Sequence, residues 1–83
     1  MYEIIFSNKA KKQFFKLEKN IQKRIIIALE RIRIRPESYI TKLVGDPGYK
    51  LRVGDYRVIM DIDNNNLLIL IIKIGHRKEI YKR

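Results

Sequence analysis

The sequence predicts an α+β domain in which a two-helix hairpin packs on one face of a single sheet. A short strand-like segment opens the chain, two stretches of helical periodicity follow, and three strand-like segments fill the second half. Strands joined by short turns pair antiparallel, and helices grouped together in sequence cover one face of such a sheet. We therefore expect an N-terminal strand, a helical hairpin and three antiparallel strands in a single domain spanning residues 1–83.

The first strand and the first helix are predicted between residues 2 and 17. The segment YEIIF at 2–6 is rich in β-branched and aromatic residues, which favour a strand. Ser7 or Asn8 can then cap a helix, because their side chains accept a hydrogen bond from the backbone N–H groups of the first turn. Apolar residues recur along this helix at Ala10, Phe14 and Leu17. Their spacing of i, i+4 and i+7 indicates an amphipathic helix.

A second amphipathic helix is predicted to begin near Asn20, which offers another cap. Its apolar stripe comprises Ile21, Ile25, Ala28, Leu29 and Ile32. The segment RIRIRP alternates with period two, as a strand does, but we interpret it as helical until Pro36 stops the helix near Arg35. The stripe leaves out Ile26, Ile27 and Ile34. These isoleucines either pack under neighbouring loops or expose a patch for a protein partner.

Three strands are predicted in the second half of the chain, at about 49–53, 55–62 and 67–74. The dipeptide Gly54-Asp55 is a two-residue hairpin connection, and the segment DNNN forms a longer one. The last strand, LLILIIKI, is apolar on both faces. That pattern is typical of a central position in a sheet.

Composition argues against several classes of protein. A chain of 83 residues buries only about 60% of the surface that its unfolded state exposes, so the core is thin. There is no cysteine, so neither a disulfide framework nor a thiolate metal site can supplement that core. The N-terminus lacks the charged-then-apolar order of a signal peptide, and the longest apolar run, 67–72, is far shorter than the roughly 20 residues that cross a bilayer. We expect a soluble, cytoplasmic protein that needs no cofactor.

The net charge of +10 arises from 19 Lys and Arg residues against nine Asp and Glu residues. The excess is spread over both halves of the chain and is not a basic tail. Such charge repels itself until counter-charge arrives, which favours a partner with a phosphate backbone. The alternative is a surface whose charge only keeps the protein soluble.

The hairpin around Gly54-Asp55 gathers cations on one face of the predicted sheet. With these two residues as the loop, Arg52 lies directly opposite Arg57, and Lys50 shares their face. The residues predicted to point toward the helices are Tyr49, Leu51, Val53, Tyr56, Val58, Met60 and Ile62. Opposed like charges destabilise an antiparallel pair, so we expect an anion between the arginines; the alternative is a set of independent, solvated cations. If the Asn-rich loop adds a third residue, Lys73 lies beside Arg57.

The C-terminal segment GHRKEIYKR adds three residue types that are used in phosphate chemistry. Gly75 can turn the chain so that His76, Arg77 and Tyr81 fold back over the sheet edge. A histidine carries protons, an arginine clamps a phosphate with two hydrogen bonds, and a tyrosine stacks on a nucleobase. Each also has another interpretation, since His76 can be an ordinary surface residue and Tyr81 can anchor the tail to the core.

Together these segments resemble the RelE family of bacterial and archaeal toxins, within the RelE/ParE superfamily. The resemblance covers nearly the whole chain and is most specific in LRVGDYRV and GHRxxxY. It implies a RelE-like fold and a type II toxin that enters the ribosomal A site, cuts mRNA without a metal ion and thereby inhibits translation. It also implies a RelB-like antitoxin that holds the toxin inactive in a heteromeric complex. No membrane partner is expected.

The resemblance also implies roles for individual residues. Arg57 follows the tyrosine of the family's YR motif and matches its phosphate-stabilising arginine, while Arg77 matches the arginine after the last strand. Tyr81 matches the C-terminal tyrosine near the reacting nucleotide, and Lys50 matches a basic residue of the preceding strand, as Arg52 does. Family members differ at the position of His76, where some carry lysine, so analogy does not identify the proton carrier.

These residues suit cleavage of RNA by its own 2′-hydroxyl. Asp61 and Asp63 are isolated at a strand end and do not form a cluster that holds two magnesium ions, so fixed cations must offset the charge that builds on the phosphorane. The catalytic candidates are Arg57, Arg77, Tyr81 and His76, and the phosphate-binding candidates are Lys50, Arg52 and Lys73. Tyr81 serves base stacking or proton transfer, and His76 is the alternative acid or base.

Two other functions stay open. ParE toxins share the fold but act on DNA gyrase and are not nucleases. They generally lack the combined arginine, arginine and tyrosine set, so its presence in this sequence favours the RelE interpretation. A non-catalytic RNA-binding or ribosome-binding protein would use the same cations only to neutralise phosphates.

Overall fold

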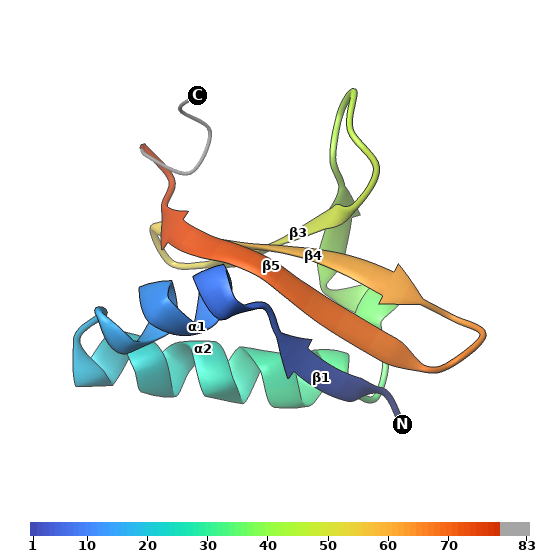
Figure 1. Cartoon of the computed structure of the whole chain (residues 1–83), viewed down its shortest axis with the longest axis horizontal. Helices are drawn as coiled ribbons and strands as arrows, with labels where there is room; N and C mark the ends of the chain where they lie inside the picture. The colour runs from blue at the N-terminus through green and yellow to red at the C-terminus, as the bar shows by residue number, and fades with distance from the viewer. Residues whose placement is uncertain (79–83) are drawn as a thin grey trace.

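The computed structural model describes residues 1–78, which form a mixed five-stranded sheet with both helices beneath one face (Figure 1). The elements in chain order are β1 (Glu3–Phe6), α1 (Asn8–Phe15), α2 (Lys19–Ile32), a 3₁₀ turn (Pro36–Ser38), β2 (Ile40–Lys42), β3 (Tyr49–Val53), β4 (Tyr56–Asp63) and β5 (Leu68–His76). The strand order is β1-β5-β4-β3-β2, with β1 parallel to β5 and the other pairs antiparallel. The predicted α+β architecture is confirmed, and β5 lies inside the sheet as its apolar sequence indicated.

Strand β2 is the element that the sequence did not predict. It pairs antiparallel with β3, with Ile40 opposite Leu51. The hairpin loop of residues 43–48 is closed by the backbone N–H of Leu43, which donates to the carbonyl of Gly48 (3.1 Å). A strand of three residues carries too little periodicity to be recognised, and it forms here because β3 offers a free edge.

The two helices begin in different ways. Ser7 caps α1, because its Oγ accepts a hydrogen bond from the backbone N–H of Ala10 (3.1 Å). The prediction that Asn20 caps the second helix was wrong. Asn20 lies in the first turn of α2, whose N-cap is Glu18, and Glu18 makes no side-chain cap bond.

Helix α2 ends at Ile32, earlier than the predicted end near Arg35, and Arg33 forms its C-cap. The isoleucines outside the helical stripe, Ile26, Ile27 and Ile34, are 43%, 53% and 70% exposed. These isoleucines therefore do not pack under neighbouring loops. They form exposed apolar surface, as the second of the two interpretations expected. Neither helix in residues 1–78 has the length and apolar content needed to span a membrane.

The core lies between the helices and the inner face of the sheet. The helices contribute Ala10, Phe14, Ile25, Leu29 and Ile32, and the strands contribute Leu51, Val53, Val58, Met60, Ile69, Ile71 and Ile74. The β3–β4 register is the predicted one, with Arg52 opposite Arg57 and Val53 opposite Tyr56. Both helices pack against the inner face, so within residues 1–78 no helix covers the outer face of the sheet (Figure 1).

A β-bulge in β5 decides which side chains reach that outer face. Ile59 pairs with Lys73 but the next residue, Met60, pairs with Ile71, so Ile72 is the extra residue. Helix α1 satisfies the backbone groups that the bulge frees. The Ser7 hydroxyl donates to the carbonyl of Ile72 (2.8 Å) and Gln13 Oε1 accepts from the N–H of Ile74 (2.8 Å). Without the extra residue, Lys73 would share the inner face with Ile71.

The turn between β4 and β5 is held by Asp63. Its carboxylate accepts hydrogen bonds from the Asn66 side chain (2.8 Å) and from the backbone N–H groups of Asn66 and Asn65. These bonds, the Asn66 side chain most of all, lower the pKa of Asp63 because they favour its ionised form. Their contribution to stability is present above the ordinary pKa of aspartate and is lost as the pH falls through the lowered value. Asp63 therefore serves the turn.

Replacing Ser7 with alanine is expected to lower the free energy of unfolding by about 1–3 kcal/mol, because one hydroxyl both caps α1 and bonds the bulge carbonyl. Urea denaturation measures the loss. Ser7→Thr keeps a hydroxyl at the same position and is expected to retain most of the stability. Equal midpoints for wild type and Ser7→Ala would show that neither hydrogen bond matters.

Candidate functional site

The outer face of the sheet carries the cations that the sequence indicated. We call this set of four cations the cationic face: Lys50, Arg52, Arg57 and Lys73. They lie in two rows across the strands, one running Lys50, Ile59, Lys73 and the other Arg52, Arg57, Gly75. Two residues along a strand separate the rows, a distance of roughly 7 Å. The sequence placed Lys73 beside Arg57 on the condition that the Asn-rich loop adds a third residue. In the structure Lys73 lies opposite Ile59, and Gly75 lies opposite Arg57.

Arg52 and Arg57 converge on the turn that joins their strands. Arg52 Nε and Arg57 Nη1 both donate to the carbonyl of Gly54, at 3.3 and 3.4 Å, and Arg57 Nη1 also donates to the carbonyl of Tyr56 at 3.2 Å. Gly54 has a φ of +59°, as the first loop position of a type II′ turn requires. A shared carbonyl thus offsets part of the repulsion between the two arginines. Both guanidinium groups keep further donors, which are available to an anion.

A hollow of about 230 Å³ lies along the Lys50–Lys73 row of the cationic face. Lys50 and Lys73 flank it, and Ile59, which is 5% exposed, lies between them in the register. The loop of residues 43–48 rises from the outer face and forms its wall with Leu43, Val44 and Asp46 (Figure 1). Two ammonium groups beside an apolar residue and a raised loop make a site that can bind an anionic chain lying across the sheet.

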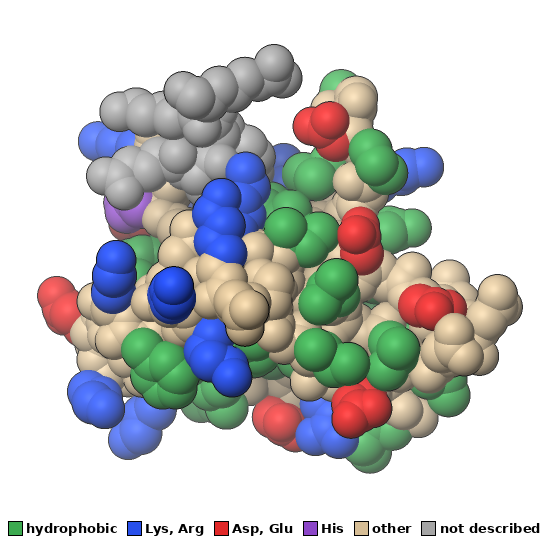
Figure 2. Space-filling model, in the orientation of Figure 1, with side chains coloured by type: hydrophobic (Ala, Val, Ile, Leu, Met, Phe, Trp, Pro, Cys, Tyr) green, Lys and Arg blue, Asp and Glu red, His purple; other side chains and the backbone are tan. Residues whose placement is uncertain are grey.

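The charges of the cationic face lack carboxylate partners. In the part of the chain that the structure describes, the one ion pair joins Arg33 to Glu30 (3.1 Å), on the opposite side of the sheet. Figure 2 shows that most Lys and Arg side chains of the visible surface lie over the helices and near the C-terminal end of β5, while Asp and Glu lie mostly toward the side of the β4–β5 turn. Within residues 1–78, no cation of the cationic face therefore forms an ion pair, and Asp46 is the one carboxylate that lines the hollow beside Lys50 and Lys73.

His76 lies on the other face of the sheet from Arg57. It pairs with Tyr56, and the two rings meet edge to face with centroids 5.5 Å apart. Paired residues share a face, and Tyr56 precedes Arg57 in an alternating strand. The Nδ1 atom of His76 accepts a hydrogen bond from the N–H of Lys78 (3.2 Å), so in this arrangement Nε2 is the nitrogen that carries the proton.

Arg77 follows at the end of β5, beside the β3–β4 turn. Its backbone N–H donates to the carbonyl of Asp55 (2.8 Å), which brings it to the same end of the sheet as Arg52 and Arg57. Its side chain is exposed. Tyr81, the remaining catalytic candidate, lies outside the described residues.

Sequence reasoning missed two arginines near this site, Arg24 and Arg31 of α2. Both line a hollow that also contains Arg52 and Gly54. Their spacing of seven residues on a helix puts them on one stripe, which is a signal that the sequence did contain. The contact with the β3–β4 turn depends on how α2 packs against the sheet, which the sequence alone does not give.

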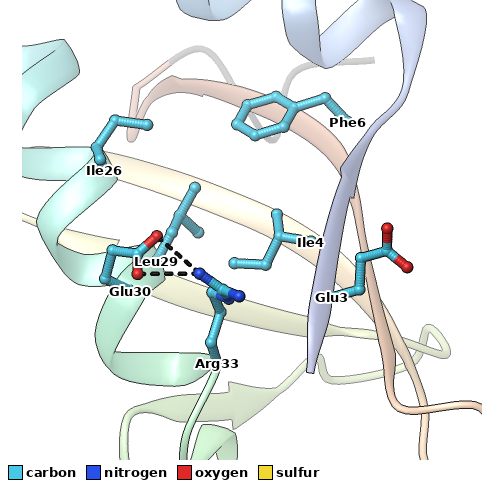
Figure 3. Close-up of a pocket in the computed structure, with 7 residues that line it drawn as sticks. All are labelled: Glu3, Ile4, Phe6, Ile26, Leu29, Glu30 and Arg33. Carbon is cyan, nitrogen blue, oxygen red and sulfur yellow. Dashed lines mark hydrogen bonds and ion pairs between the residues drawn. The ribbon is translucent and has the colours of Figure 1, made fainter. Parts of the chain in front are cut away.

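A further hollow of about 320 Å³ lies between β1 and α2 (Figure 3). Ile4, Phe6 and Leu29 point into it, and the Glu30–Arg33 ion pair closes its rim. The Arg33 Nε also donates to the carbonyl of Tyr2 (3.1 Å). The arginine of this hollow, Arg33, is already paired with Glu30, so the hollow offers no free cation. The hollow is also separate from the cationic face, since none of the four cations lines it.

Comparison with known proteins gives one matching family model, described as the ParE toxin of type II toxin–antitoxin system, parDE, which matches residues 4–81. No curated protein sequence matches the chain.

Several solved structures have the same fold. The chain is 26% identical to a chain of the intact E. coli RelBE toxin–antitoxin complex, covering 92% of this chain and 96% of that one with a TM-score of 0.78. The isolated E. coli RelE toxin is 25% identical, with 98% and 92% covered and a TM-score of 0.80. The archaeal RelE–RelB complex from Pyrococcus horikoshii is 25% identical, with 94% and 97% covered and a TM-score of 0.76.

Proposed function

The chain belongs to the ParE toxin family of type II toxin–antitoxin systems, within the RelE/ParE superfamily, and from that premise we propose that it is a ribosome-dependent endoribonuclease that cleaves mRNA in the A site. The observation that carries the proposal is the cationic face. Four cations lie there in two rows without a carboxylate partner in residues 1–78, and two of them share one turn carbonyl. A site of that kind binds a phosphate backbone more readily than any neutral substrate.

The proposed reaction is attack of an mRNA 2′-oxygen on the adjacent phosphorus, with departure of the 5′-oxygen. Arg57 donates to a non-bridging oxygen, where negative charge builds in the transition state, and Arg77 approaches the same phosphate from the end of β5. Arg52, Lys50 and Lys73 hold the flanking phosphates. Fixed guanidinium and ammonium groups are already oriented by the sheet, so little reorganisation is needed when the charge develops.

Proton transfer in this proposal falls first to Tyr81, with His76 as the alternative acid or base. The position of His76 on the face away from Arg57 supports that order. We therefore expect His76→Ala to cleave at close to the wild-type rate and to keep the same pH–rate profile. If His76 is the acid or base, the variant loses the inflection between pH 5 and 8, where histidine side chains titrate, and the rate falls about 100-fold or more.

The decisive experiment compares two targets. Purified protein is incubated with ribosomes programmed with mRNA, and separately with DNA gyrase in a supercoiling assay. The proposal predicts mRNA cut in the A site and supercoiling unchanged. The match to a model of ParE toxins favours the alternative, a gyrase inhibitor, and that alternative predicts the reverse pair of results.

The proposed regulatory partner is a RelB-like antitoxin, since two of the similar solved structures are complexes of RelE with RelB. An acidic, largely disordered segment with apolar anchors would offset the charge of +10 and cover the exposed isoleucines of α2. Ile26 and Ile27 line a hollow of about 530 Å³ together with Lys19 and Lys23, which gives apolar anchors and cations side by side. A neighbouring reading frame that encodes a short, acidic, helix-prone protein would support this pairing.

A further inference from the structure

A second cationic hollow lies on the flank of the molecule, between α2 and the β3–β4 turn. It is open to solvent, has a volume of about 290 Å³ and is lined by Arg24, Ile27, Ala28, Arg31, Arg52, Val53 and Gly54. Three of these residues are arginines and none is acidic. The space corresponds to roughly ten water molecules at about 30 Å³ each, so a phosphate group fits with water around it.

The hollow is built by helical spacing and by a glycine. Arg24 and Arg31 are two helical turns apart on α2, with Ile27 and Ala28 between them on the same stripe. The Arg24 guanidinium lies against Gly54, since a Cβ at that position would be only 2.8 Å from Nη2 and 3.3 Å from Cζ of Arg24. The absence of a side chain at Gly54 therefore lets the guanidinium approach the turn.

The charge of this hollow is not balanced. Within residues 1–78, neither Arg24 nor Arg31 donates a side-chain hydrogen bond or forms an ion pair, while Arg52 donates only to the carbonyl of Gly54. Three guanidinium groups around one space repel one another unless an anion lies between them. Guanidinium groups bind phosphate oxygens with paired, charge-assisted hydrogen bonds, which makes a phosphate the anion best matched to them.

We propose that this hollow binds a backbone phosphate of RNA outside the segment that is cut. Arg52 belongs to both the hollow and the cationic face, so an RNA strand that leaves the cationic face over the β3–β4 turn passes directly to Arg24 and Arg31. The hollow then adds affinity and orients the RNA without contacting the reacting phosphate. This inference rests on the proposed function for one part, the identification of the ligand as RNA.

The first test is direct binding. In ¹⁵N-labelled protein, the side-chain Nε–Hε signals of Arg24 and Arg31 are followed during titration with inorganic phosphate and, separately, with a single-stranded RNA hexamer. Both signals are expected to shift and to saturate with each probe. A third titration uses a Glu-rich peptide. Shifts with the peptide but with neither phosphate nor RNA would overturn the proposal and identify the hollow as a protein-binding site.

The second test removes the charge. R24Q/R31Q is compared with K11Q/K12Q, which loses the same charge from exposed positions of α1. We expect R24Q/R31Q to weaken RNA binding about 10- to 100-fold and to reduce the salt-dependence slope by about 0.7, the value for one lost phosphate on a single strand. The control is expected to change affinity by less than about threefold, and both variants should melt as wild type does. Equal affinities and slopes for the two variants would overturn the proposal.

The outcomes separate this inference from the proposed function. If the wild-type protein cuts no mRNA but the arginine signals shift with phosphate and RNA, the inference stands and the proposed reaction fails. If mRNA is cut in the A site while Arg24 and Arg31 show no shift with either probe, the reaction stands and the inference fails.

Discussion

Arg57→Gln is expected to lower single-turnover cleavage of mRNA on programmed ribosomes about 100- to 1,000-fold, the usual effect of removing one donor that stabilises transition-state charge. Arg57 is the half-buried member of the opposed arginine pair, and its hydrogen bonds to the carbonyls of Gly54 and Tyr56 fix where its guanidinium points. Glutamine keeps a polar side chain of similar reach but has no charge. Arg77→Gln is expected to have an effect of the same order.

The same substitution, Arg57→Gln, is expected to leave the free energy of unfolding unchanged or to raise it slightly. Arg57 faces Arg52 directly, and relieving opposed like charges stabilises an antiparallel pair by about several tenths of a kcal/mol. Loss of activity with an unchanged or slightly higher urea midpoint would assign the arginine to chemistry and not to folding. Arg35→Gln, which removes one exposed arginine from the segment after α2, is the control and should cut normally. A wild-type rate for Arg57→Gln would end the proposed mechanism.

Ile25→Ala is expected to lower the free energy of unfolding by about 2–5 kcal/mol. Ile25 is 0% exposed and lies in the core between α2 and the sheet, so truncation removes buried apolar surface and leaves a cavity. Domains are stable by only about 5–15 kcal/mol, so this single change removes a large share of the total.

The matched control for that experiment is Ile27→Ala, two positions along the same helix. Ile27 is 53% exposed, and its truncation is expected to cost less than about 0.5 kcal/mol. Urea denaturation of both variants, with similar m-values, measures the difference. Equal destabilisation would mean that the exposed isoleucine is packed in solution, for example against a second molecule.

Local patterns predicted much of the fold. The Gly54-Asp55 loop and the period-two alternation around it gave the correct β3–β4 register, because a two-residue hairpin leaves only one pairing. Ser7 was also predicted correctly as a cap of α1, because capping depends on residues that are neighbours in the sequence. Both ends of α2 were predicted less well, since the helix begins at Lys19, one residue before the predicted cap Asn20, and ends at Ile32.

Features that depend on distant contacts were not predicted. The bulge in β5 is held by Ser7 and Gln13 of a different element, and it places Lys73 opposite Ile59 on the outer face, where an unbroken register would place it opposite Val58 on the inner face. The opposition of Arg52 and Arg57 was predicted because it is local to one hairpin. The flank hollow was missed because Arg24 meets the turn only through helix packing.

The extra residue in β5 has a consequence for aligning related sequences. Ile72 shifts the inside–outside phase of everything after it, so Lys73 and Gly75 line up with Ile59 and Arg57 only when one column is skipped. A relative whose last strand runs without this irregularity would carry its equivalent basic residue one position away. Gap-free alignment of the strand would then equate a surface cation with a core aliphatic residue, and functional residues should be transferred there by three-dimensional superposition.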